Sequence, residues 1–224
     1  ETWMRRHIPS DAHAFVTDVT SGYAQLNVQG PRSRELLQSI TSQDLSNEAF
    51  PFRCAREIDV GFARALCVRI TYLGELGYEL YVPAEQATHV YDRIVQAGEA
   101  FDLRHAGLKA LASLRMEKGY RDYGHDIDNT DDPLSAGFGF ALALDKPGGF
   151  IGREAVLARK AAGPLTQRLV QVFVHDPQPL LFHAEVVRRD GVAVGYVRAG
   201  SYGHTLGGAV GLAMVSDWRA DGEW

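Results

Sequence analysis

The fold is decided by the stretch Tyr72-Leu73-Gly74-Glu75-Leu76-Gly77-Tyr78-Glu79-Leu80-Tyr81-Val82-Pro83. Residues 66–73 and 78–82, on either side of the glycines, alternate apolar side chains with a period of two, which predicts two strands. Gly74 and Gly77 supply the backbone freedom that a tight reversal needs. We therefore expect a β-hairpin here.

The second of these strands separates its side chains onto two faces. Because side chains alternate along a strand, Tyr78, Leu80 and Val82 share one face. Glu79 and Tyr81 then point to the other face. A carboxylate beside a phenol, close to an aromatic of the partner strand, suits a flat heterocycle that carries N–H donors.

Composition and charge narrow the class of protein. Hydrophobic residues make up 46% and charged residues 23% of the 224 residues, as in ordinary globular proteins. The net charge of −5 predicts neither a nucleic-acid partner nor an anionic membrane partner, and no apolar run reaches membrane-spanning length. Cys54 and Cys67 follow no metal or disulfide spacing, so we expect no metal site and a reducing compartment.

Helical and strand patterns alternate along the first two thirds of the chain, and the last third is all β. We expect one helix to begin at Gly30-Pro31, two more to cover residues 85–101 and 107–118, and a short one to follow Gly152. We expect strands within residues 16–28 and at 169–174, 184–189, 192–197 and 209–215. The strands at 184–189 and 192–197 are expected to be joined by a hairpin turn at Asp190-Gly191. This order predicts an α+β fold. We place one domain at residues 1–164 and a small β domain at 165–224.

Five motifs follow one another along the chain: Val-Gln-Gly-Pro-Arg-Ser at 28–33, the opening stretch at 72–79, Ser-Leu-Arg-Met-Glu-Lys-Gly at 113–119, Pro-Leu-Ser-Ala-Gly at 133–137, and Phe-Ile-Gly-Arg-Glu-Ala at 150–155. Together they resemble the glycine-cleavage T-protein (aminomethyltransferase) family of tetrahydrofolate-binding proteins. The second and third motifs are most similar to the folate domains of sarcosine and dimethylglycine dehydrogenases. The resemblance implies a partial aminomethyltransferase-type folate-binding domain, followed by a small, incomplete β-barrel domain.

The resemblance also implies the cofactor-binding residues. Glu79 matches a folate-binding Glu, and its two carboxylate oxygens suit the paired N–H donors on the pterin edge. Tyr72, Leu80 and Tyr81 match folate contacts of the dehydrogenase branch, and Phe140 matches a position where relatives carry Trp or Tyr. The alternative is an exposed glutamate on an edge strand, with the other four residues serving only as core or surface.

Two departures from the family pattern limit what the chain does alone. The T-protein proper has an Arg where this chain has Leu111, which moves the resemblance toward the dehydrogenase branch. The catalytic acid of the family is an Asp that precedes the residues matching Glu1, so we expect no catalytic residue here. We expect the chain to be truncated at both ends and inactive alone.

The implied activity is one-carbon transfer to tetrahydrofolate, coupled to oxidative demethylation of an N-methyl amine such as sarcosine or dimethylglycine, which forms 5,10-methylenetetrahydrofolate. FAD is expected only on a separate upstream domain, and the compartment is the cytoplasm or, in a eukaryote, the mitochondrial matrix. A lipoyl-dependent aminomethyltransferase and a non-catalytic folate-binding regulator are the alternatives.

The residues His125, Asp126 and Asp128 could form a metal or acid–base site. We favour a solvated, turn-rich loop for them.

Overall fold

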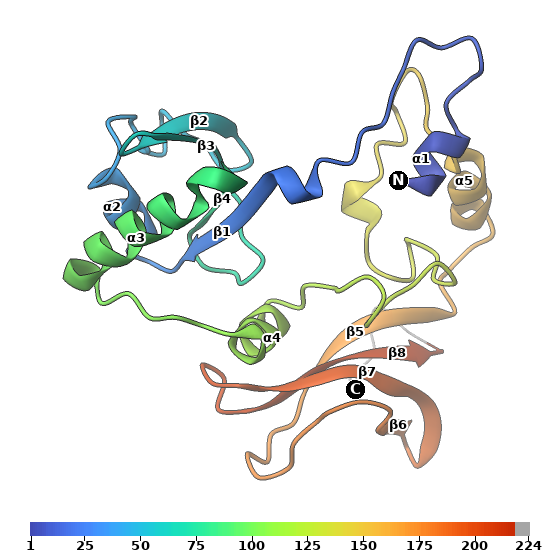
Figure 1. Cartoon of the computed structure of the whole chain (residues 1–224). Helices are drawn as coiled ribbons and strands as arrows, with labels where there is room; N and C mark the ends of the chain where they lie inside the picture. Colours follow the sequence, from blue (N-terminus) through green and yellow to red (C-terminus); the bar gives the residue numbers. More distant parts are fainter. Residues whose placement is uncertain (218–224) are drawn as a thin grey trace. The chain divides into compact units, whose positions relative to one another are not determined.

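A computed structural model describes residues 1–217 of the chain (Figure 1). It divides into two compact units, which split between His105 and Ala106. Each unit has its own sheet and its own core, and we describe them one at a time. Among the described residues, none of the helices is long and apolar enough to cross a membrane.

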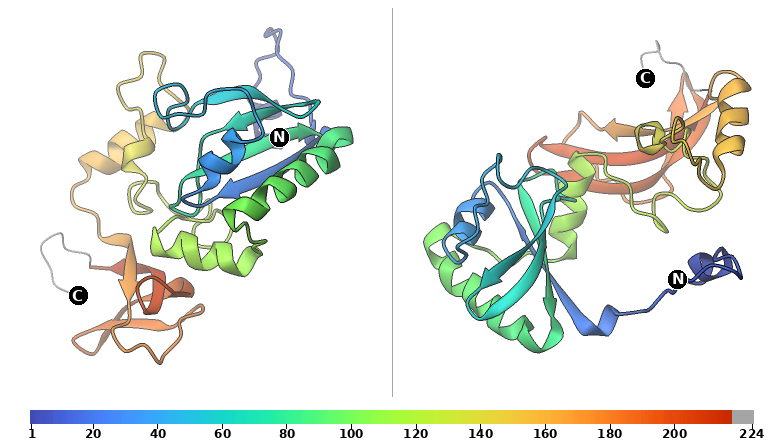
Figure 2. Two further views of the ribbon diagram at one scale, coloured as in Figure 1. Left: turned by 90° about the vertical axis from the view of Figure 1, so that its left-hand side faces the viewer. Right: turned by 90° about the horizontal axis from the view of Figure 1, so that it is seen from above.

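The first unit is a four-stranded antiparallel sheet with helices against one face (Figure 2). Its strands are β1 (Tyr23–Gln29), β2 (Ala55–Val60), β3 (Ala63–Val68) and β4 (Gly77–Pro83), in the order β1-β4-β3-β2. Its helical segments are α1 (Thr2–Arg6), η1 (Thr20–Gly22), α2 (Ser33–Gln38), η2 (Ala84–Gln86), α3 (Ala87–Gly98) and η3 (Glu99–Phe101). Leu37 of α2 and Val90 and Ile94 of α3 pack in one core with Tyr78 and Leu80 of β4.

The predicted hairpin is confirmed as a pairing but is wrong in its details. Strands β3 and β4 are antiparallel, with Val68 opposite Glu79. Strand β3 ends at Val68, however, so residues 69–76 form a longer link instead of a continued strand and a tight reversal. Gly74 does adopt the left-handed conformation, with φ of 77°. Gly77 already belongs to β4 and pairs with Gln29 of β1.

The second unit contains another antiparallel sheet, preceded by helices and by a long irregular segment. Its elements are α4 (Leu108–Glu117), η4 (Gly139–Ala141), α5 (Arg153–Ala161), β5 (Gln167–Phe173), β6 (Val186–Arg189), β7 (Val192–Gly203) and β8 (Gly208–Ser216), with the strand order β5-β8-β7-β6. The hairpin between β6 and β7 turns at Asp190 and Gly191, which both have positive φ, as a type I′ turn requires. The predicted α+β class is confirmed, with a four-stranded sheet as the C-terminal structure.

Strand β8 is buried on both of its faces. On one side Leu212 packs with Met116 of α4, and on the other Ala213 and Val215 pack with Val197 of β7. Every residue of β8 from Gly208 to Val215 is buried, which explains its nearly continuous apolar sequence.

A buried ion pair ties α4 to the segment that follows it. Arg115 and Asp126 form a two-pronged pair, and both side chains are almost completely buried. Burial raises the pKa of Asp126. Hydrogen bonds from Arg115, His125 and the backbone N–H of Asp122 lower the pKa by more than burial raises it, so the net pKa is below the ordinary value. A second pair joins Arg198 of β7 to Asp131 at 2.6 Å. Asp126 is therefore a structural residue of the loop.

Candidate functional site

The candidate site begins with the alternation along β4. Tyr78, Leu80 and Val82 are completely buried in the core of the first unit. Glu79 and Tyr81 lie on the opposite face and are half-buried. The predicted separation of these side chains onto two faces is confirmed. It follows from the pleat of a strand that has a helical layer on one side only.

Glu79 and Tyr81 are joined by a hydrogen bond. The Oη of Tyr81 donates to Oε2 of Glu79 over 2.7 Å. This bond, together with burial and the negative charge of Glu79, raises the pKa of the Tyr81 phenol. The phenol therefore remains a donor, and it fixes one carboxylate oxygen in place. The carboxylate keeps free lone pairs with which to accept N–H donors from a ligand.

The neighbouring strands give this face a polar side and an apolar side. In the register of the sheet, Asn27 of β1 and Val68 of β3 lie opposite Glu79, and Gln25 and Leu66 lie opposite Tyr81. The face thus carries amides on one flank of the carboxylate and aliphatic side chains on the other. A flat ligand with a hydrogen-bonding edge and an apolar surface matches that pattern.

An acceptor without a hydrogen-bond partner lies on the same face of the sheet as Glu79, opposite Gly77. The Oε1 of Gln29 is buried and has no hydrogen-bond partner among the described residues. Gln29 pairs with Gly77, and a Cβ at that glycine would come within 1.8 Å of this oxygen. Gly77 therefore makes the space that the Gln29 amide occupies. A buried acceptor without a donor is costly, and an N–H group of a ligand would satisfy it.

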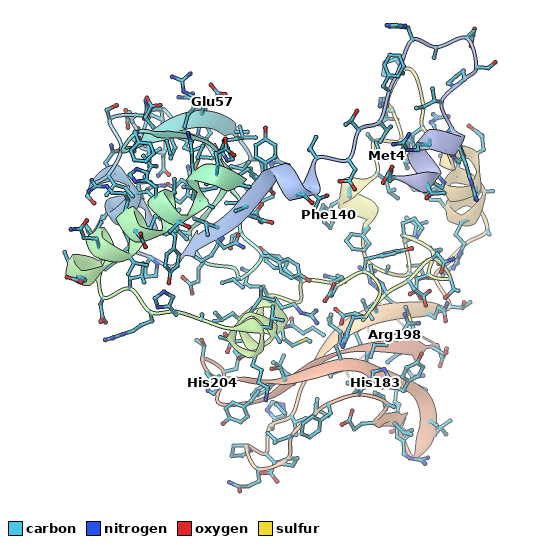
Figure 3. The ribbon with its side chains drawn as sticks, in the orientation of Figure 1. Met4, Glu57, Phe140, His183, Arg198 and His204 are labelled. Atoms are coloured by element: carbon cyan, nitrogen blue, oxygen red, sulfur yellow. The ribbon has the colours of Figure 1, made fainter. Side chains whose placement is uncertain are left out.

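The other predicted site residues lie in three different places. Tyr72 is half-buried in the link 69–76. Leu80 belongs to the same strand as Glu79, but its side chain is fully buried on the core face. Phe140 lies on η4 in the second unit, and its side chain is 86% exposed (Figure 3). The structure brings Glu79 and Tyr81 together, and the parts of the other three residues in the site stay predictions.

The motif around the third helix is mainly structural. Leu111 is a half-buried residue of α4, and it brings no positive charge to this position. Arg115 of the same motif is the buried partner of Asp126.

Within residues 1–217, no group of three or more His, Cys, Asp or Glu side chains is placed to hold a metal ion.

Sequence reasoning missed the contribution of β1 to this face. Gln25, Asn27 and Gln29 alternate with the half-buried Ala24 and Leu26 and the buried Val28, so their polar face was visible in the sequence. The sequence did not show that β1 pairs with β4. That pairing joins segments far apart in the chain, and it is set by the packing of the whole sheet.

Comparisons with known proteins agree with this fold. The model of the GCVT N-terminal domain matches residues 1–146, and that of the glycine cleavage T-protein C-terminal barrel domain matches residues 167–224. The chain belongs to the glycine cleavage T-protein family. It is an aminomethyltransferase-type domain of a family that binds tetrahydrofolate.

Relatives of this T-protein chain include larger enzymes. It is 46% identical over 202 residues to 4-methylaminobutanoate oxidase (formaldehyde-forming) of Paenarthrobacter nicotinovorans, covering 90% of the chain and 24% of the relative. It is 36% identical over 200 residues to the mitochondrial sarcosine dehydrogenase of Homo sapiens, covering 89% and 22%. The chain therefore spans about a quarter of the length of these relatives.

A solved structure shares the fold. It is the glycine cleavage system aminomethyltransferase T of Bartonella henselae, with a TM-score of 0.73 and 25% sequence identity. The match covers 87% of this chain and 52% of that structure. The family models leave residues 147–166 unmatched, and our division at residues 164 and 165 falls within this interval and stays a proposal.

Proposed function

We propose that the chain binds tetrahydrofolate on the exposed face of the first sheet, with Glu79 accepting N–H donors of the pterin. The observation that supports this most is the Tyr81–Glu79 hydrogen bond, which holds a carboxylate in place on a half-buried strand face. When bound, tetrahydrofolate would supply the nitrogen that accepts a one-carbon unit. The residues of this chain would bind and orient it, which is a contribution by proximity.

Each neighbouring side chain has a definite task in this proposal. Tyr81 donates to one oxygen of Glu79 and so fixes the plane of the carboxylate. The orphaned Oε1 of Gln29 accepts a further N–H group. The aliphatic side chains of Leu66 and Val68 contact the flat surface of the ring. Tyr72 and Phe140 remain proposed ring contacts, and Leu80 contributes by anchoring the strand in the core.

The reaction we propose for the whole protein is one-carbon transfer coupled to oxidative demethylation of an N-methyl amine. The names of the sarcosine dehydrogenase and 4-methylaminobutanoate oxidase relatives support this class of substrate. Sarcosine, dimethylglycine and 4-methylaminobutanoate are the candidates. FAD would be carried outside these residues, and the compartment would be the cytoplasm or the mitochondrial matrix. Leu111 argues against a lipoyl-dependent aminomethyltransferase. A non-catalytic folate-binding regulator remains an alternative.

Titration with tetrahydrofolate tests the site. In Glu79→Gln, one acceptor of the carboxylate is replaced by an NH₂ donor, so we expect tetrahydrofolate to bind about tenfold to a hundredfold more weakly. Glu35→Gln is the matched control, because Glu35 is an exposed glutamate of the same unit, on α2. Isothermal titration calorimetry measures both affinities. Equal affinity of Glu79→Gln and the unsubstituted chain would refute the site.

The substrate is tested in the full-length protein. Single-turnover assays with each of the three amines, in the presence of tetrahydrofolate, measure transfer of the methyl carbon to the folate. We expect transfer with one of them. Oxidation of the amine without any transfer to folate would contradict the proposed coupling. The protein would then be an oxidase that releases the methyl carbon as formaldehyde.

A further inference from the structure

The turn that leads into strand β2 holds an arginine in a strained backbone conformation. The N–H of Cys54 donates to the carbonyl oxygen of Pro51 over 3.1 Å, which closes a turn with Phe52 and Arg53 at its centre. Arg53 has φ of 68°, in the left-handed region. A positive φ at the third residue alone is typical of a type II turn, where glycine or asparagine is the usual residue. An arginine at this position costs stability that a glycine would not.

Contacts within the chain do not explain why an arginine occupies this position. The Arg53 side chain is exposed, and it forms no hydrogen bond or ion pair with any of residues 1–217. Its backbone is held in place, because its N–H donates to the carbonyl oxygen of Arg69 over 2.8 Å. The fold thus presents this guanidinium to solvent from a fixed turn. Strained residues are concentrated at functional sites, which makes Arg53 a candidate contact for a partner.

Three further arginines lie around the same turn. Arg69 donates from Nη1 to the carbonyl oxygen of Phe50 over 2.8 Å, and the guanidinium of Arg56 lies 5.8 Å from the centre of the Phe50 ring. Arg34 of α2 donates from Nε to the Oη of Tyr78, whose ring centre lies 5.9 Å from that of Phe50. Within residues 1–217, none of the four arginines forms an ion pair with a carboxylate. Positive charge therefore gathers here, in a chain whose net charge is −5.

One exposed acid offsets part of this charge. Hydrogen bonds from Ser46 are the main cause of the lowered pKa of Asp44, and the charge of Arg56 contributes to it. The carboxylate of Asp44 nevertheless forms no ion pair with Arg56 in the described part of the chain. The surface around the turn keeps an excess of positive charge.

This surface lies on the opposite side of the sheet from Glu79. Arg56 of β2 is opposite Cys67 of β3, and Cys67 is buried in the core of the first unit. Because directly opposite residues of paired strands project to the same face, Arg56 also points to the helical side of the sheet. Tyr78, the partner of Arg34, is buried on that side as well. The surface shares no residue with the proposed folate site.

We propose that the turn at residues 51–54 and the arginines around it bind an acidic segment of a partner protein. Phe52 is 55% exposed and provides an apolar contact beside Arg53. Aromatic residues and arginines are enriched where protein interfaces gain most of their binding energy. Arg53 pairs with a carboxylate of the partner in the two-pronged geometry that a guanidinium favours. The charge of the surface requires an acidic segment, and Phe52 requires an apolar side chain within it.

A short fluorescein-labelled peptide in which glutamate and leucine alternate is the probe, and fluorescence anisotropy measures its affinity for the 224-residue chain. We expect the peptide to bind, and its affinity to fall as salt is added because salt screens ion pairs. Arg53→Gly should weaken binding about tenfold through the loss of a charge-assisted contact, and Phe52→Ser should weaken it by a similar factor. Arg64→Ala is the control with the same change in charge. Arg64 is an exposed arginine of the same sheet that already pairs with Glu57 and Asp59, so its loss should change the affinity less than about twofold.

The glycine variant separates binding from folding. Because glycine suits a positive φ, the urea midpoint of Arg53→Gly should be no lower than that of the unsubstituted chain. A lower midpoint, no binding of the peptide, or equal affinity in Arg53→Gly and the unsubstituted chain would overturn the proposal. Equal weakening by Arg64→Ala, or equal affinity for a single-stranded oligonucleotide of the same charge, would also overturn it, since the surface would then bind any polyanion. Glu79→Gln should leave the peptide affinity unchanged, which separates this test from that of the folate site.

Discussion

At the scale of single residues, the Glu79 carboxylate depends on its neighbour. A half-buried carboxylate on a strand can adopt several rotamers, and the hydrogen bond from Tyr81 selects one of them. The same bond favours the protonated phenol, so folding and the protonation of Tyr81 are linked. One phenol thereby orients the acceptor that we assign to the pterin.

Tyr81→Phe removes the orienting bond and retains the ring. We expect tetrahydrofolate affinity to fall about fivefold to tenfold, less than in Glu79→Gln, because the carboxylate is still present.

The stability of the folded chain depends on pH through the raised pKa of the Tyr81 phenol. Its contribution to stability is complete below the ordinary pKa of tyrosine and is lost as the pH rises through the higher pKa of the folded state.

Calorimetry of the variant and an ultraviolet titration of the tyrosines measure these two effects. Tyr23→Phe provides the control, because Tyr23 is an exposed tyrosine of the same sheet. An unchanged folate affinity in Tyr81→Phe would mean that Glu79 needs no orientation.

Only part of the site could be predicted from the sequence. Alternation alone placed Glu79 and Tyr81 on one face, because that depends only on the pleat of a single strand. The same rule placed Leu80 on the core face, where the structure shows it to be fully buried, although the family resemblance named it as a folate contact. The orphaned oxygen of Gln29 could not be predicted, since it results from the pairing of β1 with β4.

At the scale of elements, the second sheet depends on close backbone approach between β7 and β8. Gly195 of β7 lies opposite Val215, and a Cβ there would come within 1.9 Å of the Met214 carbonyl oxygen. That oxygen belongs to a paired strand and cannot move aside easily. Gly195 therefore allows the two strands to stay in register.

Gly195→Ala should destabilise the second unit by about 3 kcal/mol, because the methyl group must displace backbone atoms. Gly148→Ala is the control, since a Cβ at Gly148 meets no atom within 4 Å. Its free energy of unfolding should stay within about 0.5 kcal/mol of that of the unsubstituted chain. Urea unfolding followed by circular dichroism compares the two variants. Similar midpoints for both would show that β8 shifts without cost.

The link between α4 and the following loop gives a second prediction at this scale. Asp126→Asn removes the anion that neutralises the buried Arg115, so we expect a loss of about 3 to 5 kcal/mol in stability. Asp128→Asn, at an exposed aspartate of the same loop, should cost much less. Urea unfolding at neutral pH measures both.

The acid dependence of this pair has a definite sign. Because the pKa of Asp126 is lowered in the folded state, the unfolded chain binds a proton more readily in mildly acidic solution. The stability contributed by Asp126 is complete above the ordinary pKa of aspartate and is lost as the pH falls through the lower, folded-state pKa. The difference between the unsubstituted chain and Asp126→Asn should shrink over that range. A constant difference would contradict the assignment.

Elements with strong local signals could be predicted well. The helices expected over 85–101 and 107–118 and the Asp190-Gly191 turn depend on signals in short segments, and the structure has α3, α4 and a turn with positive φ at these places. Strand β2 was missed, although Ile58 and Val60 alternate with Glu57 and Asp59. The pair of Arg115 and Asp126 joins a helix to a loop through side chains, and no local pattern shows such a contact.

At the scale of the whole molecule, the chain consists of two units with separate cores. Residues 104–107 between them are exposed and contain neither helix nor strand. Backbone that is exposed and irregular is where proteases cut first. The boundary between the units is therefore open to a direct test.

Limited trypsin digestion should cut after Arg104 early and leave fragments that begin or end there. The Arg104 side chain is 81% exposed. Mass spectrometry identifies the fragments, and Arg104→Gln should abolish this cut and leave the others unchanged. Early cuts within β3, β4 or β8 instead would show that the sheets are less stable than their burial indicates.

The position of β4 inside its sheet has a consequence for cooperativity. Because β1 and β3 pair with β4 on both sides, local fraying cannot release Glu79 while the rest of the sheet persists. The carboxylate face and the core of the first unit are then lost in a single event. Any ligand that binds Glu79 would therefore stabilise that unit against global unfolding, and a partly unfolded form would have no affinity for the ligand.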